Sequence, residues 1–565
     1  MDENIAKSAS EAPAARTATN AGAASNETAS AAATAATPAN PANAYTNHEI
    51  MSRKSVFALA GVLVATLVAG GIAYAAQGDS QIDTGNASGA PAQMASASGS
   101  HSGHGPDGAG APDGGKALGS AGAPDGQGGA PGGGGANTQT FDYAGSYAAT
   151  LVADGQEATA SAQNIEATES LSNAALAENG GTLAIDGSSL LKSGDADDGD
   201  SCNFYGVNSV LLAVGEGSSA TISDSSITAS SKGSNGIFAT DGATVHASNT
   251  SITTSADNSR GLDATYGGSI VAANMDISTQ GDHCASFATD RGGGYITVSD
   301  SQAKTAGSGS PLIYSTGSIE VSNLTGEASG SQIAGMEGLN TISISNSNLA
   351  STITSKTASD PIANGVIIYQ STSGDADTAT GEVARFEAVD STLSSAIQSG
   401  AMFYCTNTQA DIALQNTVLD FDSDAANLIV AAGNDSNSWG KAGQNGATVS
   451  FTGYGETLKG NVAADTISSL SLYLRDGSAW TGATAIEENA DGDTSDAPIT
   501  VNIDSSSTWV VSDSCTVSNL NAEDGAQIVD ANGNTASIVV NGETVVSGTS
   551  DIVVNVTGSY AATIE

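Results

Sequence analysis

Four residues of this sequence have the types and spacing of a saccharide-processing site: Asp241, Tyr266, Asp290 and Arg291. The first three fall at corresponding points of successive sequence repeats, and Arg291 directly follows the last carboxylate. If successive coils lie ~4.8 Å apart, the two carboxylates are about 9–10 Å apart, near the upper end of the range for inverting glycoside hydrolases. Tyr266 would lie between them, and Arg291 would bind the carboxylate of an acidic sugar. This pattern predicts a polysaccharide lyase or a glycoside hydrolase.

The same residues also fit ordinary turns. Asp-Gly is a turn dipeptide, and the sequences around Asp241 and Asp290 both have the composition of turns. A lyase also needs an acidic cluster that holds calcium, together with an Arg or Lys base, and a hydrolase needs carboxylates that converge in a groove. The sequence has five histidines and no G-x-S-x-G motif, so a nucleophilic triad has no support. We therefore favour a non-catalytic protein and keep the carbohydrate-active enzyme as the alternative.

Two acidic segments could hold structural calcium. One places three carboxylates on one face of a strand, and the other resembles part of a calcium-binding loop. Neither segment completes the twelve-residue loop with its bidentate Glu. We expect no cofactor, and calcium stays an alternative. The candidate ligands are Asp420, Asp422 and Asp424 in the first segment, and Asn489, Asp491 and Asp493 in the second.

A repeat must position all of these residues. Its pattern is apolar, x, apolar, x, Asp or Asn, a Ser/Thr-like residue, x, apolar, and its Asp/Asn positions from 224 to 346 are 25, 25, 26, 23 and 23 residues apart. The alternation predicts strands with one inward face, and the period suits one coil of a three-strand β-helix. Asp and Asn tolerate left-handed backbone angles at sharp turns and can form a ladder along the stack. The predicted structural ladder contains Asp224, Asn249, Asn274, Asp300, Asn323, Asn346, Asp390 and Asn416.

The pattern changes after about residue 440, which divides the predicted solenoid into a main repeat region, residues 138–440, and C-terminal coils with a cap, residues 441–565. Trp480 and Trp509 follow an apolar residue at the same offset, so we expect them to pack along the stack. The gap between Asn346 and Asp390 predicts a loop insertion centred on residues 373–377. An acidic insertion at residues 194–200 should also project from the coils.

Three segments precede the solenoid. Residues 1–50 are rich in Ala, Ser and Thr without an apolar period, which predicts disorder. Residues 51–76 contain a basic pair and an apolar run, residues 56–76, which is just long enough to span a membrane and leave the C-terminal part outside. This segment also fits a signal peptide that begins at Met51 and is cleaved after Ala75. Residues 77–137 predict a flexible Gly-, Ala- and Pro-rich linker.

Composition and charge restrict the partners. The net charge is −45, so nucleic acid is excluded as a partner, because affinity for phosphates depends on Lys and Arg. Only 4% of the residues are aromatic and 69 are Gly, which suits the thin core of a solenoid. The four cysteines lie far apart without a CxxC spacing, so either disulfides or buried thiols are open.

The coil sequences resemble those of secreted and surface-attached right-handed parallel β-helix proteins, the pectate-lyase-like superfamily in its adhesin-like branch, and the Trp-bearing coils look like those of autotransporter passengers. The resemblance covers roughly residues 140–565. It implies the fold and a cell-surface location, with a glycan or a protein as the ligand and the membrane as a partner only if residues 56–76 are retained. It supplies no functional motif. The segments that carry it are residues 203–206, 233–236, 290–294, 310–315 and 337–340.

Overall fold

The computed structural model describes residues 139–371, 383–435, 439–492 and 497–564. The predicted segments 1–50, 51–76 and 77–137 lie outside these residues, as does the insertion centred on residues 373–377. Within the described ranges, no helix has both the length and the apolar character that a membrane span requires.

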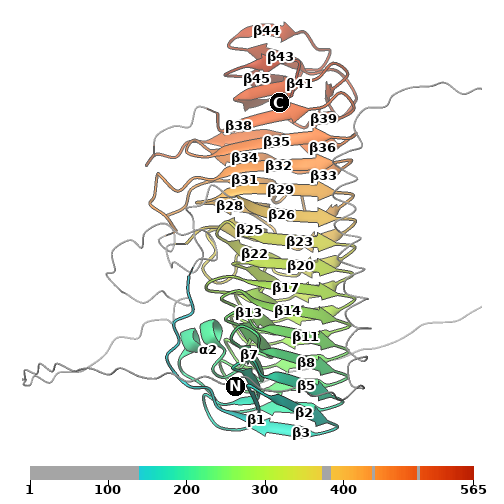
Figure 1. Cartoon of the computed structure of the whole chain (residues 1–565). Coiled ribbons are helices and arrows are strands. Elements are labelled where there is room, and N and C mark those ends of the chain that lie inside the picture. Colours follow the sequence, from blue (N-terminus) through green and yellow to red (C-terminus); the bar gives the residue numbers. More distant parts are fainter. Residues whose placement is uncertain (1–138, 372–382, 436–438, 493–496, 565) are drawn as a thin grey trace, which may run out of the picture. The chain divides into compact units, whose positions relative to one another are not determined.

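The chain winds through three long sheets in turn, so that every third strand joins the same sheet (Figure 1). All neighbouring strands within these three sheets run parallel, and equivalent apolar residues pair from coil to coil. Val245 pairs with Ile270, Ile270 pairs with Ile296, and Ile296 pairs with Ile319. The predicted coils are therefore confirmed, and the fold is a parallel β-helix solenoid.

Sheet 1 contains thirteen strands, and one of its faces forms part of the candidate site. In sheet order they are β1 (Ala149–Asp154), β4 (Asn173–Glu178), β7 (Leu211–Val214), β10 (Ile237–Thr240), β13 (Leu262–Ala264), β16 (Phe287–Thr289), β19 (Ile313–Ser315), β22 (Ala334–Glu337), β25 (Asn364–Tyr369), β28 (Ala401–Thr406), β31 (Asn427–Ala431), β34 (Val462–Asp465) and β37 (Thr484–Glu487).

Sheet 2 contains fifteen strands and begins the next side of each coil. In sheet order they are β2 (Glu157–Ser161), β5 (Thr182–Asp186), β8 (Ser219–Ser223), β11 (Thr244–Ser248), β14 (Gly268–Ala273), β17 (Gly294–Ser299), β20 (Ser318–Ser322), β23 (Thr341–Ser345), β26 (Ala384–Val389), β29 (Gln409–Gln415), β32 (Thr448–Tyr454), β35 (Ser469–Arg475), β38 (Ile499–Ile503), β41 (Asn519–Ala522) and β46 (Tyr560–Ala561).

Sheet 3 closes each coil with ten short strands. In sheet order they are β3 (Asn164–Ala167), β6 (Ser189–Lys192), β9 (Ser226–Ala229), β12 (Ser251–Thr254), β15 (Asp276–Thr279), β18 (Gln302–Thr305), β21 (Thr325–Ala328), β24 (Asn348–Ser351), β27 (Thr392–Ser395) and β30 (Val418–Asp420).

The C-terminal coils replace sheet 3 with two small sheets of four strands each. The change falls between β30 and β33, which brackets residue 440. Sheet 4 consists of β33 (Thr457–Lys459), β36 (Ala479–Gly482), β39 (Thr508–Val511) and β42 (Gln527–Val529). Sheet 5 consists of β40 (Cys515–Val517), β45 (Val553–Val556), β43 (Ser537–Val540) and β44 (Glu543–Val546), and its β43–β44 pair is antiparallel.

The core is the narrow column that the composition predicts. In sheet 2, buried and exposed positions alternate along each strand, and the inward residues are mainly Ile, Val, Leu and Ala. Aromatic side chains stack at a few levels. Trp480 and Trp509 are fully buried and paired across β36 and β39, with ring centroids 4.8 Å apart. Each indole N–H donates to a backbone carbonyl, at 2.8 and 2.9 Å, so the predicted packing of the tryptophans is confirmed.

The turn between sheet 2 and sheet 3 carries the Asp/Asn row. All eight residues of the predicted ladder have φ between +48° and +54°. Three Asn–Asp pairs form side-chain hydrogen bonds, in which the Asn amide of one coil donates to the Asp carboxylate of the preceding coil. These bonds join Asn249 to Asp224 (3.1 Å), Asn323 to Asp300 (2.9 Å) and Asn416 to Asp390 (2.6 Å).

A second polar row lies one residue further along, and it is buried. At several coils the hydroxyl of this Ser accepts a hydrogen bond from the backbone N–H of the equivalent residue in the preceding coil. Ser188 N–H donates to Ser225 Oγ (3.0 Å), and Ser347 N–H donates to Ser391 Oγ (3.1 Å). The Ser/Thr-like position of the repeat thus satisfies backbone donors that the sharp turn would otherwise leave buried without an acceptor.

The outer face of sheet 1 is covered at its N-terminal end. Helix α2 (Gly199–Tyr205) packs there, and its cap Gly206 has φ 69°. The N-terminal strap, which we define as residues 139–148, packs on the same face. Phe141 and Tyr147 contact an outward row that includes Leu212 and Phe238. The predicted acidic insertion, residues 194–200, leads into α2.

Candidate functional site

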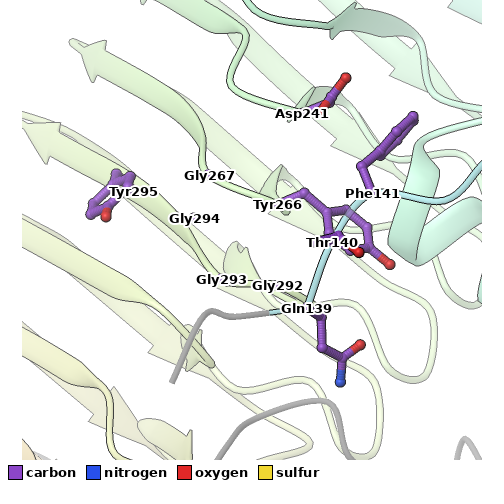
Figure 2. Close-up of a pocket in the computed structure, with 10 residues that line it drawn as sticks. All are labelled: Gln139, Thr140, Phe141, Asp241, Tyr266, Gly267, Gly292, Gly293, Gly294 and Tyr295. Carbon is purple, nitrogen blue, oxygen red and sulfur yellow. The ribbon is translucent and has the colours of Figure 1, made fainter. Parts of the chain in front are cut away.

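A pocket of about 400 Å³ lies beside the strap, where sheet 1 passes into sheet 2 (Figure 2). Two of the four predicted site residues, Asp241 and Tyr266, line it. Arg291 and Asp290 are absent from the described lining. The lining residues are Gln139, Thr140, Phe141, Asp241, Tyr266, Gly267, Gly292, Gly293, Gly294 and Tyr295.

The strand register explains why the four residues separate. Leu262 pairs with Phe287, so Asp290 stands opposite Thr265, one position before the row of Asp241 and Tyr266. Further along, Gly268 pairs with Gly294, a spacing one residue longer. The coil with 26 residues therefore places its extra residue in the turn at positions 290–293. This shift puts Asp290 on the outer face of sheet 1.

Left-handed backbone geometry shapes the pocket wall. Asp241 and Tyr266 have φ 53° and 46°, so each side chain leaves a tight turn. Gly292, with φ 72°, lies against the strap, and a Cβ there would lie only 2.4 Å from the Tyr266 ring and 3.0 Å from the Gln139 carbonyl oxygen. The strap can approach the turn this closely because residue 292 has no side chain.

Tyr266 contributes its ring to the pocket wall. Its ring stacks on Tyr205 of α2 at 5.7 Å, and Phe141 of the strap meets it edge-on at 5.5 Å. Its hydroxyl is hydrogen-bonded to that of Tyr205, which in turn donates to Asp142. Burial and the Tyr205 hydrogen bond raise the pKa of Tyr266 well above its usual value. A phenol in this state does not serve as a general base near neutral pH.

Asp290 belongs to a buried ion group rather than to the pocket. Its Oδ2 lies 2.7 Å from Nη1 of Arg260, and Oδ2 of Asp263 lies 2.8 Å from the same nitrogen. Asp263 is fully buried, and nothing among the described residues donates a hydrogen bond to its Oδ1. Burial and the nearby Asp290 raise the pKa of Asp263 to about 7, although Arg260 opposes this shift.

Arg291 is also directed elsewhere. Its guanidinium carbon lies 3.9 Å from the centroid of the Phe204 ring in α2, which is a cation–π arrangement. The side chain therefore helps to hold α2 on sheet 1. In this position it cannot offer its guanidinium to an acidic sugar in the pocket.

A further carboxylate, Glu337, lies on the outer face of sheet 1. Tyr314 and Tyr369 donate hydrogen bonds to its Oε2, at 2.9 and 3.1 Å, and Ser371 donates to its Oε1. Trp439 stacks on Tyr369 at 4.2 Å. Glu337 is only 3% exposed, so this network stabilises the outer layer and does not present an open groove.

Tyr295 is the site residue that the sequence analysis missed. Its side chain is 54% exposed, and it is the only aromatic residue among the exposed large hydrophobic side chains of the described chain. The signal was present in the repeat, because Ile296 points inward and Tyr295 must therefore point outward. Its row neighbours in sheet 2 are Ser269 and Ser318, so a tyrosine at this position is conspicuous.

Electrostatics single out Asp241 within the pocket. It is the only charged residue among the lining residues described, and it is half-buried. Burial, with a smaller contribution from the nearby Glu216 carboxylate, raises its pKa above the usual value for an aspartate. An aromatic ring, one carboxylate and several main-chain groups can bind a polar ligand. Hydrolysis by the usual mechanism needs a second carboxylate across the bond.

The calcium candidates are used in local turns and strand contacts. Asp422 Oδ1 accepts a hydrogen bond from Asp424 N–H (3.1 Å), and Asp420 Oδ2 accepts one from Ser394. Asn489 donates to Asp465 (2.9 Å), which is a structural contact to sheet 1. Asp491 N–H donates to Asn489, and Asp493 lies outside the described residues. Within the described ranges, no group of three or more His, Cys, Asp or Glu side chains could hold a metal ion.

All four cysteines are buried free thiols. Cys284 stands in a buried polar row, where its Sγ accepts the N–H of Ser259 at 3.0 Å and its own N–H donates to Ser310 Oγ at 2.9 Å. Burial raises the pKa of the Cys284 thiol to about 12. A thiol in this position replaces the serine hydroxyl of the neighbouring coils.

The fold and the site define a class, the parallel β-helix solenoids with a small lateral pocket. No protein-family model matches the chain, and no curated protein or solved structure shows significant similarity to it.

Proposed function

We propose that this chain is a non-catalytic, extracytoplasmic binding protein of the adhesin-like kind, and that the pocket beside the strap binds a saccharide. The observation that carries the proposal is Tyr295, an exposed aromatic ring at the edge of a 400 Å³ pocket with polar walls. Sugars present both apolar ring faces and hydroxyl groups. Sites for such ligands combine aromatic surfaces with a few well-placed polar groups.

The rigid surroundings support a binding role. Tyr295 begins β17, which pairs on both sides with parallel strands, so its backbone is fixed by the sheet. The opposite wall is the strap, held by the aromatic contacts of Phe141. A preformed site loses little conformational entropy when a ligand binds.

We further propose that the fold is the right-handed β-helix of the pectate-lyase-like superfamily, since parallel crossover connections are right-handed in ~98% of cases. Export of the solenoid would follow from residues 51–76, either as an anchor that keeps the protein on the cell surface or as a signal cleaved near Ala75. Amino-terminal sequencing of the exported protein would separate the two, because cleavage would leave Ala76 as the first residue.

Glycan-array binding of the full-length chain tests the function directly. We expect saccharide binding that Tyr295→Ala weakens at least tenfold, because the substitution removes the exposed ring. Tyr473→Ala is the matched control, since Tyr473 lies on the outer side of β35 in the same sheet, far along the axis. Binding that responds equally to both substitutions, or no binding to any glycan, would contradict the proposal.

The enzymatic alternative has its own test. The full-length chain would be incubated with uronate-rich and neutral polysaccharides, and new reducing ends or unsaturated products would be measured. We expect none, because the pocket residues described include one carboxylate and the Tyr266 hydroxyl is hydrogen-bonded to Tyr205. Product formation that Asp241→Asn abolishes would identify the chain as a lyase or a hydrolase.

A further inference from the structure

The dimensions of the pocket restrict the length of its ligand. Tyr295 pairs with Ser269, which pairs with Thr244, so Tyr295 lies two coils beyond the coil that carries Asp241. Two coils correspond to about 9–10 Å along the axis. Figure 2 shows Asp241 and Tyr295 at different edges of the pocket. A ligand that touches both must therefore extend over more than one sugar ring.

The charge of the pocket restricts the chemistry of its ligand. Among the lining residues described, Asp241 is charged and no Lys, Arg or His is present. Glu216 stands in the turn next to it, since a Cβ at Gly242 would lie 3.8 Å from the Glu216 Cβ. Arg291, the nearest candidate for binding an acidic sugar, stacks on Phe204.

A carboxylate-bearing sugar would meet like charge at this end of the pocket, while an ammonium group would meet opposite charge. At a half-buried site these interactions are screened less than on an open surface. A hydroxyl group would still donate a hydrogen bond to the Asp241 carboxylate. The same site should therefore rank three otherwise similar sugars by the charge that they carry.

From this geometry we infer that the pocket binds an amino-bearing or uncharged oligosaccharide at least two residues long, discriminates against uronates, and uses Asp241 as its specificity-determining residue. The inference rests on the proposed saccharide-binding function. It adds the ligand class and the length of the ligand to that proposal.

The test uses three β-1,4-linked tetramers with the same ring configuration: glucosamine, glucose and glucuronate. Calorimetry with the full-length chain should rank their affinities in that order, with the glucosamine tetramer at least tenfold tighter than the glucuronate tetramer. Monomeric glucosamine should bind at least tenfold more weakly than its tetramer. A uronate tetramer that binds as tightly as the glucosamine tetramer would overturn the inference.

Asp241→Asn removes the charge and keeps a residue type that tolerates φ 53°. It should bring the affinities for the glucosamine and glucose tetramers within about threefold of each other, while the affinity for the glucose tetramer changes less than twofold. Asp276→Asn is the control, since it removes one exposed charge from sheet 3 and should leave the ranking unchanged. If Asp241→Asn leaves the ranking intact, the assignment of specificity to Asp241 is wrong.

The outcomes also separate the inference from the function beneath it. Binding of all three tetramers that depends on Tyr295 but not on their charge would uphold the saccharide-binding proposal and overturn the inference. If no tetramer and no glycan on an array binds, both fail.

Discussion

The buried ion group around Arg260 predicts that the solenoid becomes locally more stable as pH falls from 8 to 5. Asp263 and Asp290 both contact the same guanidinium nitrogen, so the group carries one excess negative charge when both are ionised. Burial raises the pKa of Asp263 to about 7, above the ~3.9 of an unfolded chain. The folded protein therefore binds a proton that the unfolded chain releases. Stability must fall as pH rises from about 4 to about 7, and stay low above that.

The magnitude follows from the same values. Each pKa unit corresponds to about 1.4 kcal/mol, so the stabilisation lost between pH 5 and pH 8 is on the order of 3 kcal/mol. Asp263→Asn imitates the protonated carboxyl group, because its amide oxygen can still accept the Arg260 hydrogen bond. We expect the variant to match the wild type near pH 5 and to exceed it by this amount at pH 8.

Hydrogen exchange is the suitable assay, because the coils of a long solenoid need not unfold together. Protection of the backbone amides in β13 and β16, corrected for the intrinsic pH dependence of exchange, would be compared for both proteins at pH 5 and 8. Asp276→Asn controls for the general repulsion of a chain with net charge −45. If the wild type and Asp263→Asn lose protection in parallel between pH 5 and 8, Asp263 does not titrate in that window and the reasoning fails.

Two further predictions concern the polar rows. Cys284→Ser should change the melting temperature little, since a hydroxyl can accept the Ser259 N–H, whereas Cys284→Val should destabilise by about 1–3 kcal/mol because it leaves that donor buried without an acceptor; thermal unfolding of both variants would show the difference. Asn249→Ala should destabilise by about 1–2 kcal/mol, because Ala is strained at φ 49° and loses the bond to Asp224, and Asn249→Gly should recover the part that is backbone strain. Equal losses for Ala and Gly in urea unfolding would show that strain plays no role.

The sequence was sufficient for the coils because a solenoid repeats its own evidence. Each strand shows the same alternation, and each turn needs a residue that accepts a left-handed conformation, so Asn249 and Asn274 mark equivalent points in consecutive coils. Contacts within a coil stack join residues about one period apart. A short pattern and its period therefore determine most of the pairing.

The candidate site was predictable only in part. Its position next to Asp241 and Tyr266 follows from the row of turn residues. The displacement of Asp290 depends on where a coil of 26 residues places its extra residue, and the repeat pattern does not contain that information. Contacts between Phe141 and Tyr266 join residues that are five coils apart, and no periodic signal connects them.

The strap provides the last test, because it forms one wall of the pocket and is held mainly by aromatic contacts. The Phe141 ring lies 5.6 Å from Tyr205 and 5.5 Å from Tyr266, and it packs on the outward row of sheet 1. Phe141→Ala should loosen this wall, at a loss of about 2–4 kcal/mol of local contact energy, while the coils beneath keep their hydrogen bonds. We expect protease cleavage within residues 139–148 to become faster and the affinity for saccharide to fall at least as much as in Tyr295→Ala. Faster cleavage with unchanged affinity would mean that Tyr295 and the coil turns bind the ligand without the strap.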